Sequence, residues 1–131
     1  MNIELLKKVI ARYMSLHPND DFGIEKCWEE MTDILSDDIS ATISFFEREC
    51  TDEEFYWLGS VFEDIAEKTQ SKELIQVLRS RIAKVLPETY CQQNFKTEHM
   101  RKWVDYAEYV RSISSDIDYA EGRIDDDVDI L

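Results

Sequence analysis

Hydrophobic residues recur every three or four positions along most of the chain, the spacing that places them on one face of an α-helix. In residues 2–16 this stripe contains Ile3, Leu6 and Ile10, and Pro18 ends it. Stretches with the same spacing follow at 24–35, 39–50, 52–69, 72–86 and 97–113. The pattern predicts an all-α protein, a single compact domain of six to seven helices.

The last part of the chain has a different pattern. Residues 114–131, SSDIDYAEGRIDDDVDIL, contain seven acidic residues and one basic residue. Ile117, Ala120, Ile124, Val128 and Leu131 have helical spacing, but Gly122 and three consecutive aspartates disfavour a helix. We therefore expect a helical domain over residues 1–114, followed at 115–131 by either an acidic tail or a short docked helix.

Composition supports a helical domain and adds a strong negative charge. The 131 residues include 3 glycines and 2 prolines, fewer than the tight turns between strands usually require. They also include 29 acidic and 15 basic residues, which gives a net charge of −14. Such a chain repels nucleic acids and anionic membranes and attracts basic proteins. The charge either serves a basic protein partner or only keeps an abundant protein in solution.

The cysteines and the N-terminus bear on the compartment. Cys27, Cys50 and Cys91 are far apart in sequence and form no Cys-x-x-Cys pair, which is typical of proteins from a reducing compartment. The N-terminus lacks the uninterrupted apolar run of a signal peptide, and no apolar stretch approaches the length of a membrane span. We expect a cytoplasmic protein.

The sequence contains no recognisable catalytic or metal-binding motif. Its two histidines, His17 and His99, are far apart, and its glycines form no phosphate-binding loop. Cys27 and Cys50 fall on apolar helix faces, where small buried hydrophobic residues are expected. Asp125, Asp127 and Asp129 have the spacing of calcium ligands, but Ile130 stands where an EF-hand loop needs glycine. We expect no enzyme activity, no metal and no cofactor.

The segment TDEEFYWLGSVFEDIAEKTQSKE, residues 51–73, combines two helix faces. Thr51 and Glu54 have the spacing of a capping box, which predicts a helix that begins at residue 52. One face contains Phe55, Leu58, Phe62 and Ile65 and is expected in the core. The opposite side is acidic and also contains a tyrosine and a tryptophan, residue types that anchor protein interfaces. The candidate partner-binding residues are Glu53, Tyr56, Trp57, Glu63, Asp64 and Glu67.

Other readings of the acidic residues stay open at this point. Trp57 could instead pack beneath a neighbouring helix, and acidic residues on a helix are often no more than a solvated face. The acidic tail is a second candidate for partner binding. A hydrolase that uses a carboxylate pair such as Glu63 and Asp64 is a much weaker third possibility, because an acid-rich chain contains such pairs by chance.

Two parts of the sequence resemble a known family. They are the run from Cys50 to Val85, CTDEEFYWLGSVFEDIAEKTQSKELIQVLRSRIAKV, and the residues Trp28, Glu30, Met31 and Ile34-Leu35. They resemble the immunity proteins of bacterial contact-dependent growth inhibition and related polymorphic toxin systems, over roughly residues 24–86. The resemblance implies a protein that binds and neutralises a cognate toxin C-terminal domain, often a basic nuclease such as a ribonuclease. The alternative is an acidic adaptor or regulatory protein that binds another basic protein. A block shared across the family could serve the fold, with the toxin contact in the tail or in 97–113.

Overall fold

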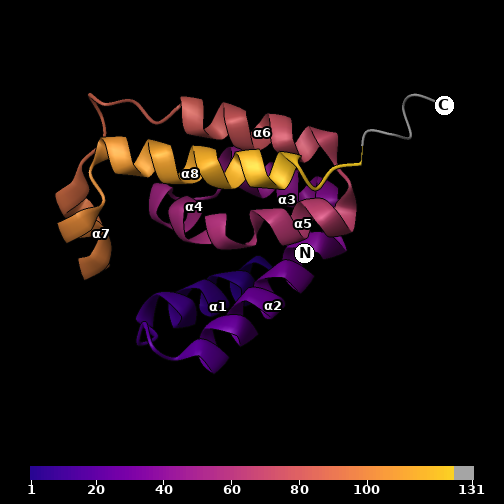
Figure 1. Cartoon of the computed structure of the whole chain (residues 1–131), viewed down its shortest axis with the longest axis horizontal. Helices are drawn as coiled ribbons and strands as arrows, with labels where there is room; N and C mark the ends of the chain where they lie inside the picture. Colours follow the sequence, from indigo (N-terminus) through magenta and orange to yellow (C-terminus); the bar gives the residue numbers. More distant parts are fainter. Residues whose placement is uncertain (126–131) are drawn as a thin grey trace.

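The computed structural model describes residues 1–125 of the chain, and its regular structure in this range consists of helices joined by short turns (Figure 1). The α-helices are α1 (Ile3–Ser15), α2 (Asp21–Asp37), α3 (Ile39–Arg48), α4 (Asp52–Leu58), α5 (Phe62–Thr69), α6 (Lys72–Ala83), α7 (Glu98–Trp103) and α8 (Tyr106–Glu121). Two short 3₁₀ helices are η1 (Gly59–Val61) and η2 (Gln92–Asn94). The prediction of an all-α single domain is confirmed.

Most helices begin at a side chain that accepts a backbone N–H of the first turn. The residues that do so are Asn2, Asp20, Asp38, Thr51, Ser71 and Asp105. At α4 the predicted capping box is present, because Thr51 accepts from the Glu54 N–H and the Glu54 side chain accepts from the Thr51 N–H. These polar residues therefore fix where the helices start.

Two expected helices are interrupted. The helix expected over 52–69 contains the 3₁₀ turn η1 between α4 and α5. Here Gly59 lies against α8 so closely that a Cβ atom would come within 2.3 Å of the Asp116 carboxylate. The expectation of a single helix over 97–113 is wrong, because Val104 and Asp105 leave the helical conformation and the Asp105 side chain caps α8.

Helix α8 crosses the domain boundary that was expected at residue 114. It continues to Glu121, and Ile117, Ala120 and Ile124 are buried. Residues 115–125 are therefore part of the packed domain. Val128 and Leu131, the remaining positions of the docked-helix alternative, lie outside the described residues, as do Asp127 and Asp129.

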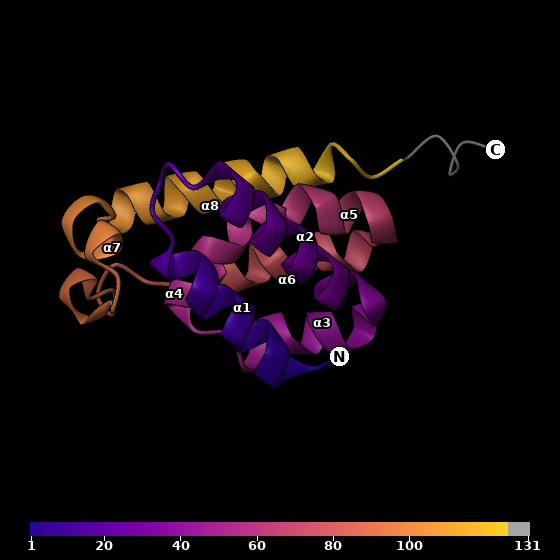
Figure 2. The ribbon, with the colours of Figure 1, turned by 90° about the horizontal axis from the view of Figure 1, so that it is seen from below.

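The helices pack in a layered arrangement around α5. Figure 1 shows α6 and α8 side by side, α5 next to α8, and the α1–α2 pair on the opposite side. Seen from below in Figure 2, α1 and α2 lie in front of the other helices. Helix α1 contacts α4, and α2 contacts α3 and α5. The face between α2 and α5 is thus formed by segments that are about 35 residues apart in sequence.

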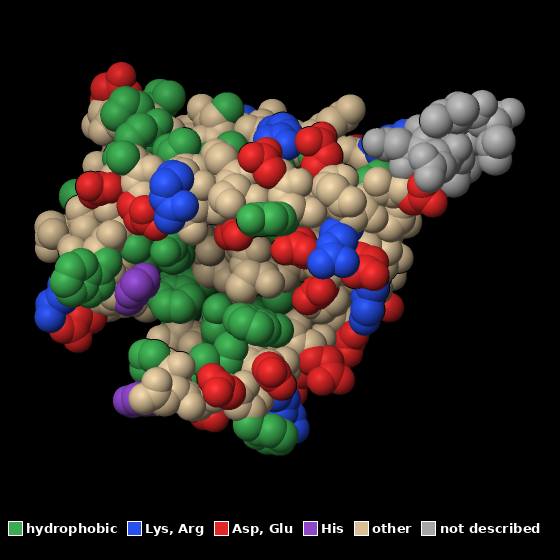
Figure 3. Space-filling model, viewed as in Figure 1, with side chains coloured by type: hydrophobic (Ala, Val, Ile, Leu, Met, Phe, Trp, Pro, Cys, Tyr) green, Lys and Arg blue, Asp and Glu red, His purple; other side chains and the backbone are tan. Residues whose placement is uncertain are grey.

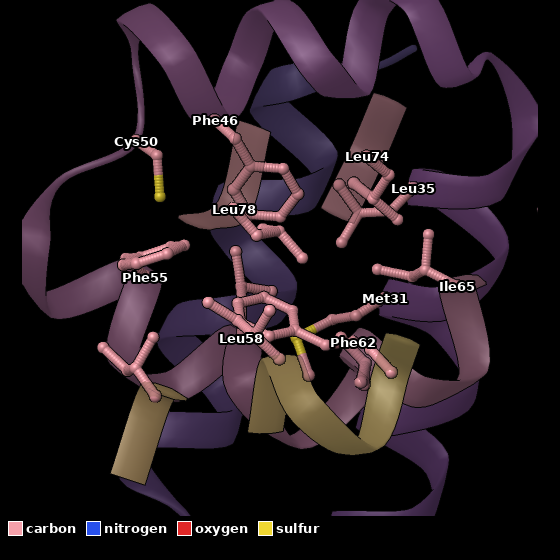
Figure 4. Packing of buried hydrophobic residues seen from close by; sticks show 14 of the residues in the cluster. Met31, Leu35, Phe46, Cys50, Phe55, Leu58, Phe62, Ile65, Leu74 and Leu78 are labelled. Carbon is pink, nitrogen blue, oxygen red and sulfur yellow. The ribbon is translucent and has the colours of Figure 1, made fainter. Parts of the chain in front are cut away.

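The core is built from apolar faces of all these helices (Figure 4). Phe46 is fully buried and contacts the rings of Phe45, Phe55 and Phe62, with centroid distances of 5.6–6.0 Å. The predicted core stripe of the 51–73 segment is confirmed, since its four main residues are fully buried. Cys27 and Cys50 are also buried, as predicted. None of the helices within residues 1–125 is long and apolar enough to cross a membrane.

Candidate functional site

The structure separates Glu53 from the exposed acidic surface. Its side chain is only 8 % exposed, and its carboxylate accepts the N–H groups of Lys96 and Thr97, each at 2.9 Å, and the Thr97 hydroxyl at 2.7 Å. Burial alone would raise the pKa of Glu53, but these hydrogen bonds outweigh it and lower the pKa. Glu53 therefore fastens the segment before α7 to α4 and is not available to a partner.

Tyr56 and Trp57 are partly buried, so neither stands free on the surface. The Tyr56 ring stacks on Tyr109 of α8 at 5.9 Å, and Trp57 packs edge-on against Tyr13 of α1 at 5.4 Å. The alternative in which Trp57 packs beneath a neighbouring helix is confirmed. His99 of α7 faces both rings, at centroid distances of 6.4 and 5.9 Å. These aromatic residues join α1, α4, α7 and α8.

Glu63 and Glu67 share a basic partner within the chain. Arg123 lies 2.9 Å from Glu63 and 3.7 Å from Glu67. Gln70, which adopts a left-handed backbone conformation with φ 52°, donates to the Arg123 carbonyl and accepts the Asp125 N–H. The residues that follow α8 are thus attached to α5, and part of the acidic charge there is already compensated.

Asp64 has a different environment, because it lines an open groove between α5 and α2. The groove has a volume of about 510 Å³, in the range typical of ligand pockets. It is lined by Glu25, Trp28, Glu29 and Thr32 from α2 and by Asp64, Glu67 and Lys68 from α5. Figure 3 shows acidic side chains over these helices on both sides of a hollow with a hydrophobic floor.

The groove carries more negative charge than its own basic residue can compensate. Lys68 is its single cation, and its ammonium group is bound by Asp33 at 2.8 Å. That bond raises the pKa of Lys68, and the charges of Asp64 and Glu29 raise it further. In the part of the chain that the structure describes, Glu25, Glu29 and Asp64 have no ion-pair partner. The groove is therefore an uncompensated acidic site that faces solvent.

Sequence reasoning found one wall of this groove and missed the other. Glu25, Trp28, Glu29 and Thr32 were not proposed as partner-binding residues, and Trp28 lies in the 24–35 stretch whose hydrophobic residues were expected on one helix face. Trp28 is partly buried, with its ring 6.4 Å from Tyr13. The spacing of these four positions places them on one helix face. That signal was present, but only the packing of α2 against α5 brings this face to Asp64.

Other candidate chemistry does not converge in the structure. Within residues 1–125, no group of three or more His, Cys, Asp or Glu side chains could hold a metal ion. Burial raises the pKa of the Cys50 thiol, which disfavours the reactive thiolate. Glu30 is engaged by Arg12. Comparison with known proteins gives no match: no family model, no curated protein and no solved structure is similar to this chain.

Proposed function

We propose that this chain is an immunity protein that binds and neutralises a cognate toxin domain, a basic nuclease such as a ribonuclease. The observation that carries the proposal is the acidic groove between α2 and α5, where Glu25, Glu29 and Asp64 surround Trp28 and have no ion-pair partner within residues 1–125. Both walls of the groove lie within the span, residues 24–86, over which the sequence resembles immunity proteins.

The charge of the chain suits such a partner. A nuclease is basic where it holds nucleic acid, because phosphate binding requires lysine and arginine. A protein of net charge −14 attracts that surface and accelerates encounter, and the effect weakens as salt is added. The tryptophan in the groove supplies the apolar contact that charge alone does not give, since aromatic residues dominate binding energy at interfaces. Inhibition by stoichiometric binding needs no catalytic group on this chain.

The direct test is co-expression with the product of the gene immediately upstream. We expect that product to arrest growth alone, growth to be restored when this chain is present, and the two proteins to co-purify as a tight stoichiometric complex. A non-toxic upstream product, or a toxic one that this chain neither binds nor neutralises, would contradict the proposal. A basic, non-toxic partner would instead favour an acidic adaptor.

A matched pair of variants tests whether the groove is the contact surface. Glu29→Gln with Asp64→Asn removes one carboxylate from each wall, and neither side chain has an ion pair with another described residue. Glu49→Gln with Glu88→Gln removes the same charge from exposed positions outside the groove. We expect the first pair to lower the affinity for the toxin domain by about fivefold or more and the second by less than about twofold. Equal losses would assign the attraction to net charge alone.

A further inference from the structure

Within the described residues, helix α2 carries three buried polar groups without hydrogen-bond partners, two of them on residues that line the groove. The indole N–H of Trp28 and the hydroxyls of Thr32 and Ser36 are buried, and within residues 1–125 none has a hydrogen-bond partner. Thr32 is only 4 % exposed, and both Trp28 and Thr32 line the acidic groove. Buried polar side chains are nearly always hydrogen-bonded, and an unpartnered group is costly. A ligand in the groove would satisfy the groups on Trp28 and Thr32 once these side chains rotate toward it.

The chemistry of the groove specifies the ligand. Its carboxylates only accept hydrogen bonds, and a threonine hydroxyl can accept as well as donate. The site is therefore complementary to a cation with several N–H donors. A guanidinium has five donors in a plane and stacks on aromatic rings, whereas an ammonium is a compact and strongly hydrated charge. The one ammonium group present, that of Lys68, is engaged by Asp33 outside the groove lining.

We propose that the groove between α2 and α5 receives an arginine side chain from an extended segment of the basic partner. The guanidinium lies against Trp28, between Glu29 on α2 and Asp64 on α5. The Thr32 hydroxyl accepts one of its N–H groups after rotating about χ1, since threonine populates two rotamers in helices. The Trp28 ring tilts toward the groove, and its indole N–H, buried in the free protein, then donates to a peptide carbonyl of the same segment. This inference rests on the proposed function and names the chemical group that the groove recognises.

The inference can be tested without the toxin, by NMR titration with acetylated, amidated hexaarginine and hexalysine. The readout is the indole N–H signal of Trp28, one of three tryptophans, identified by its loss in Trp28→Phe. We expect hexaarginine to shift this signal and to bind at least about threefold more tightly than hexalysine. No shift at Trp28, or equal binding of the two peptides, would overturn the inference.

Two sets of variants separate the groove from general charge and from folding. Glu29→Gln with Asp64→Asn should weaken hexaarginine binding by about fivefold or more, and Glu49→Gln with Glu88→Gln by less than about twofold. Thr32→Val removes an unpartnered buried hydroxyl, so the protein should unfold at the same or higher urea concentration while binding hexaarginine about threefold more weakly. Equal losses in both double variants, or unchanged binding by Thr32→Val, would count against an arginine site.

The two proposals fail in different ways. If the upstream product is toxic and neutralised but hexaarginine does not act at Trp28, the arginine site is rejected and the immunity function stands. If hexaarginine binds as expected but the upstream product is neither toxic nor bound, the immunity function is rejected. The groove would then be the arginine-binding site of an adaptor.

Discussion

Replacing Glu53 by glutamine should destabilise the junction between α4 and the segment before α7. The Glu53 carboxylate accepts the Lys96 N–H with one oxygen and both the N–H and the hydroxyl of Thr97 with the other. Glutamine has the same shape but only one acceptor oxygen. If that oxygen keeps the Thr97 contacts, the amide nitrogen faces the Lys96 N–H, and this backbone donor loses its acceptor.

The size of the effect follows from that single lost contact. An unsatisfied buried donor costs about 1–3 kcal/mol. In a domain of this size, 1 kcal/mol corresponds to about 4 °C in Tm, so we expect Tm to fall by about 4–12 °C. Glu49→Gln is the matched control, because Glu49 is exposed and its side chain makes no hydrogen bond or ion pair within the described chain. Its unfolding free energy should change by less than about 0.5 kcal/mol.

The assay is urea unfolding followed by far-UV circular dichroism at several pH values. Hydrogen bonds hold the pKa of folded Glu53 below its usual value, so the stabilisation is fully present above the unfolded-state pKa of about 4.3 and is lost as pH falls through the folded-state pKa. The difference between wild type and Glu53→Gln should therefore be largest at neutral pH and shrink below about pH 4. A variant as stable as wild type at pH 7, or a difference independent of pH, would refute the reasoning.

Three further predictions concern single positions that are partly or fully buried. Burial, reinforced by Glu63, raises the pKa of Asp116 to about 6, so the folded state holds this proton more tightly and stability should fall as pH rises from about 4 to about 6. Asp116→Asn should remove that slope and stabilise the protein at pH 7 by on the order of 2 kcal/mol in urea unfolding; an unchanged slope would contradict this. Phe46→Ala, at a fully buried site among three other rings, should cost about 3–5 kcal/mol of unfolding free energy, and a loss below about 2 kcal/mol would place Phe46 outside the core. Trp57→Phe removes a buried N–H that has no partner within residues 1–125, so calorimetry should show less than about 1.5 kcal/mol of destabilisation; a larger loss would mean that the N–H is satisfied.

Local patterns were enough to predict most of the fold. The period of Phe55, Leu58, Phe62 and Ile65 identified a core face, and all four side chains are fully buried. The capping box at Thr51 identified the start of α4. Both features depend on residues within one or two helical turns of each other, so the local sequence is sufficient to predict them.

Features that depend on distant segments could not be predicted in this way. Nothing near Glu53 in sequence indicates that its carboxylate meets Thr97, more than forty residues away. The groove likewise depends on the packing of α2 on α5, and so Glu29 was not assigned to it. One local feature was missed as well: the Asp105 side chain caps α8 and breaks the helical pattern between α7 and α8, although the hydrophobic spacing continues across it.

The acidic residues of the 51–73 segment have three different environments, and this difference bears on binding. A carboxylate that already has a cation must give up that contact before it can bind another, so it gains little from a basic partner. The Glu53 carboxylate is hydrogen-bonded within the fold, and Glu63 shares the cation Arg123 with Glu67. Asp64 has no such contact and faces Glu29 across the groove. A basic partner therefore gains most where α2 meets α5, and least at Glu53 and Glu63, whose carboxylates are already bound within the fold.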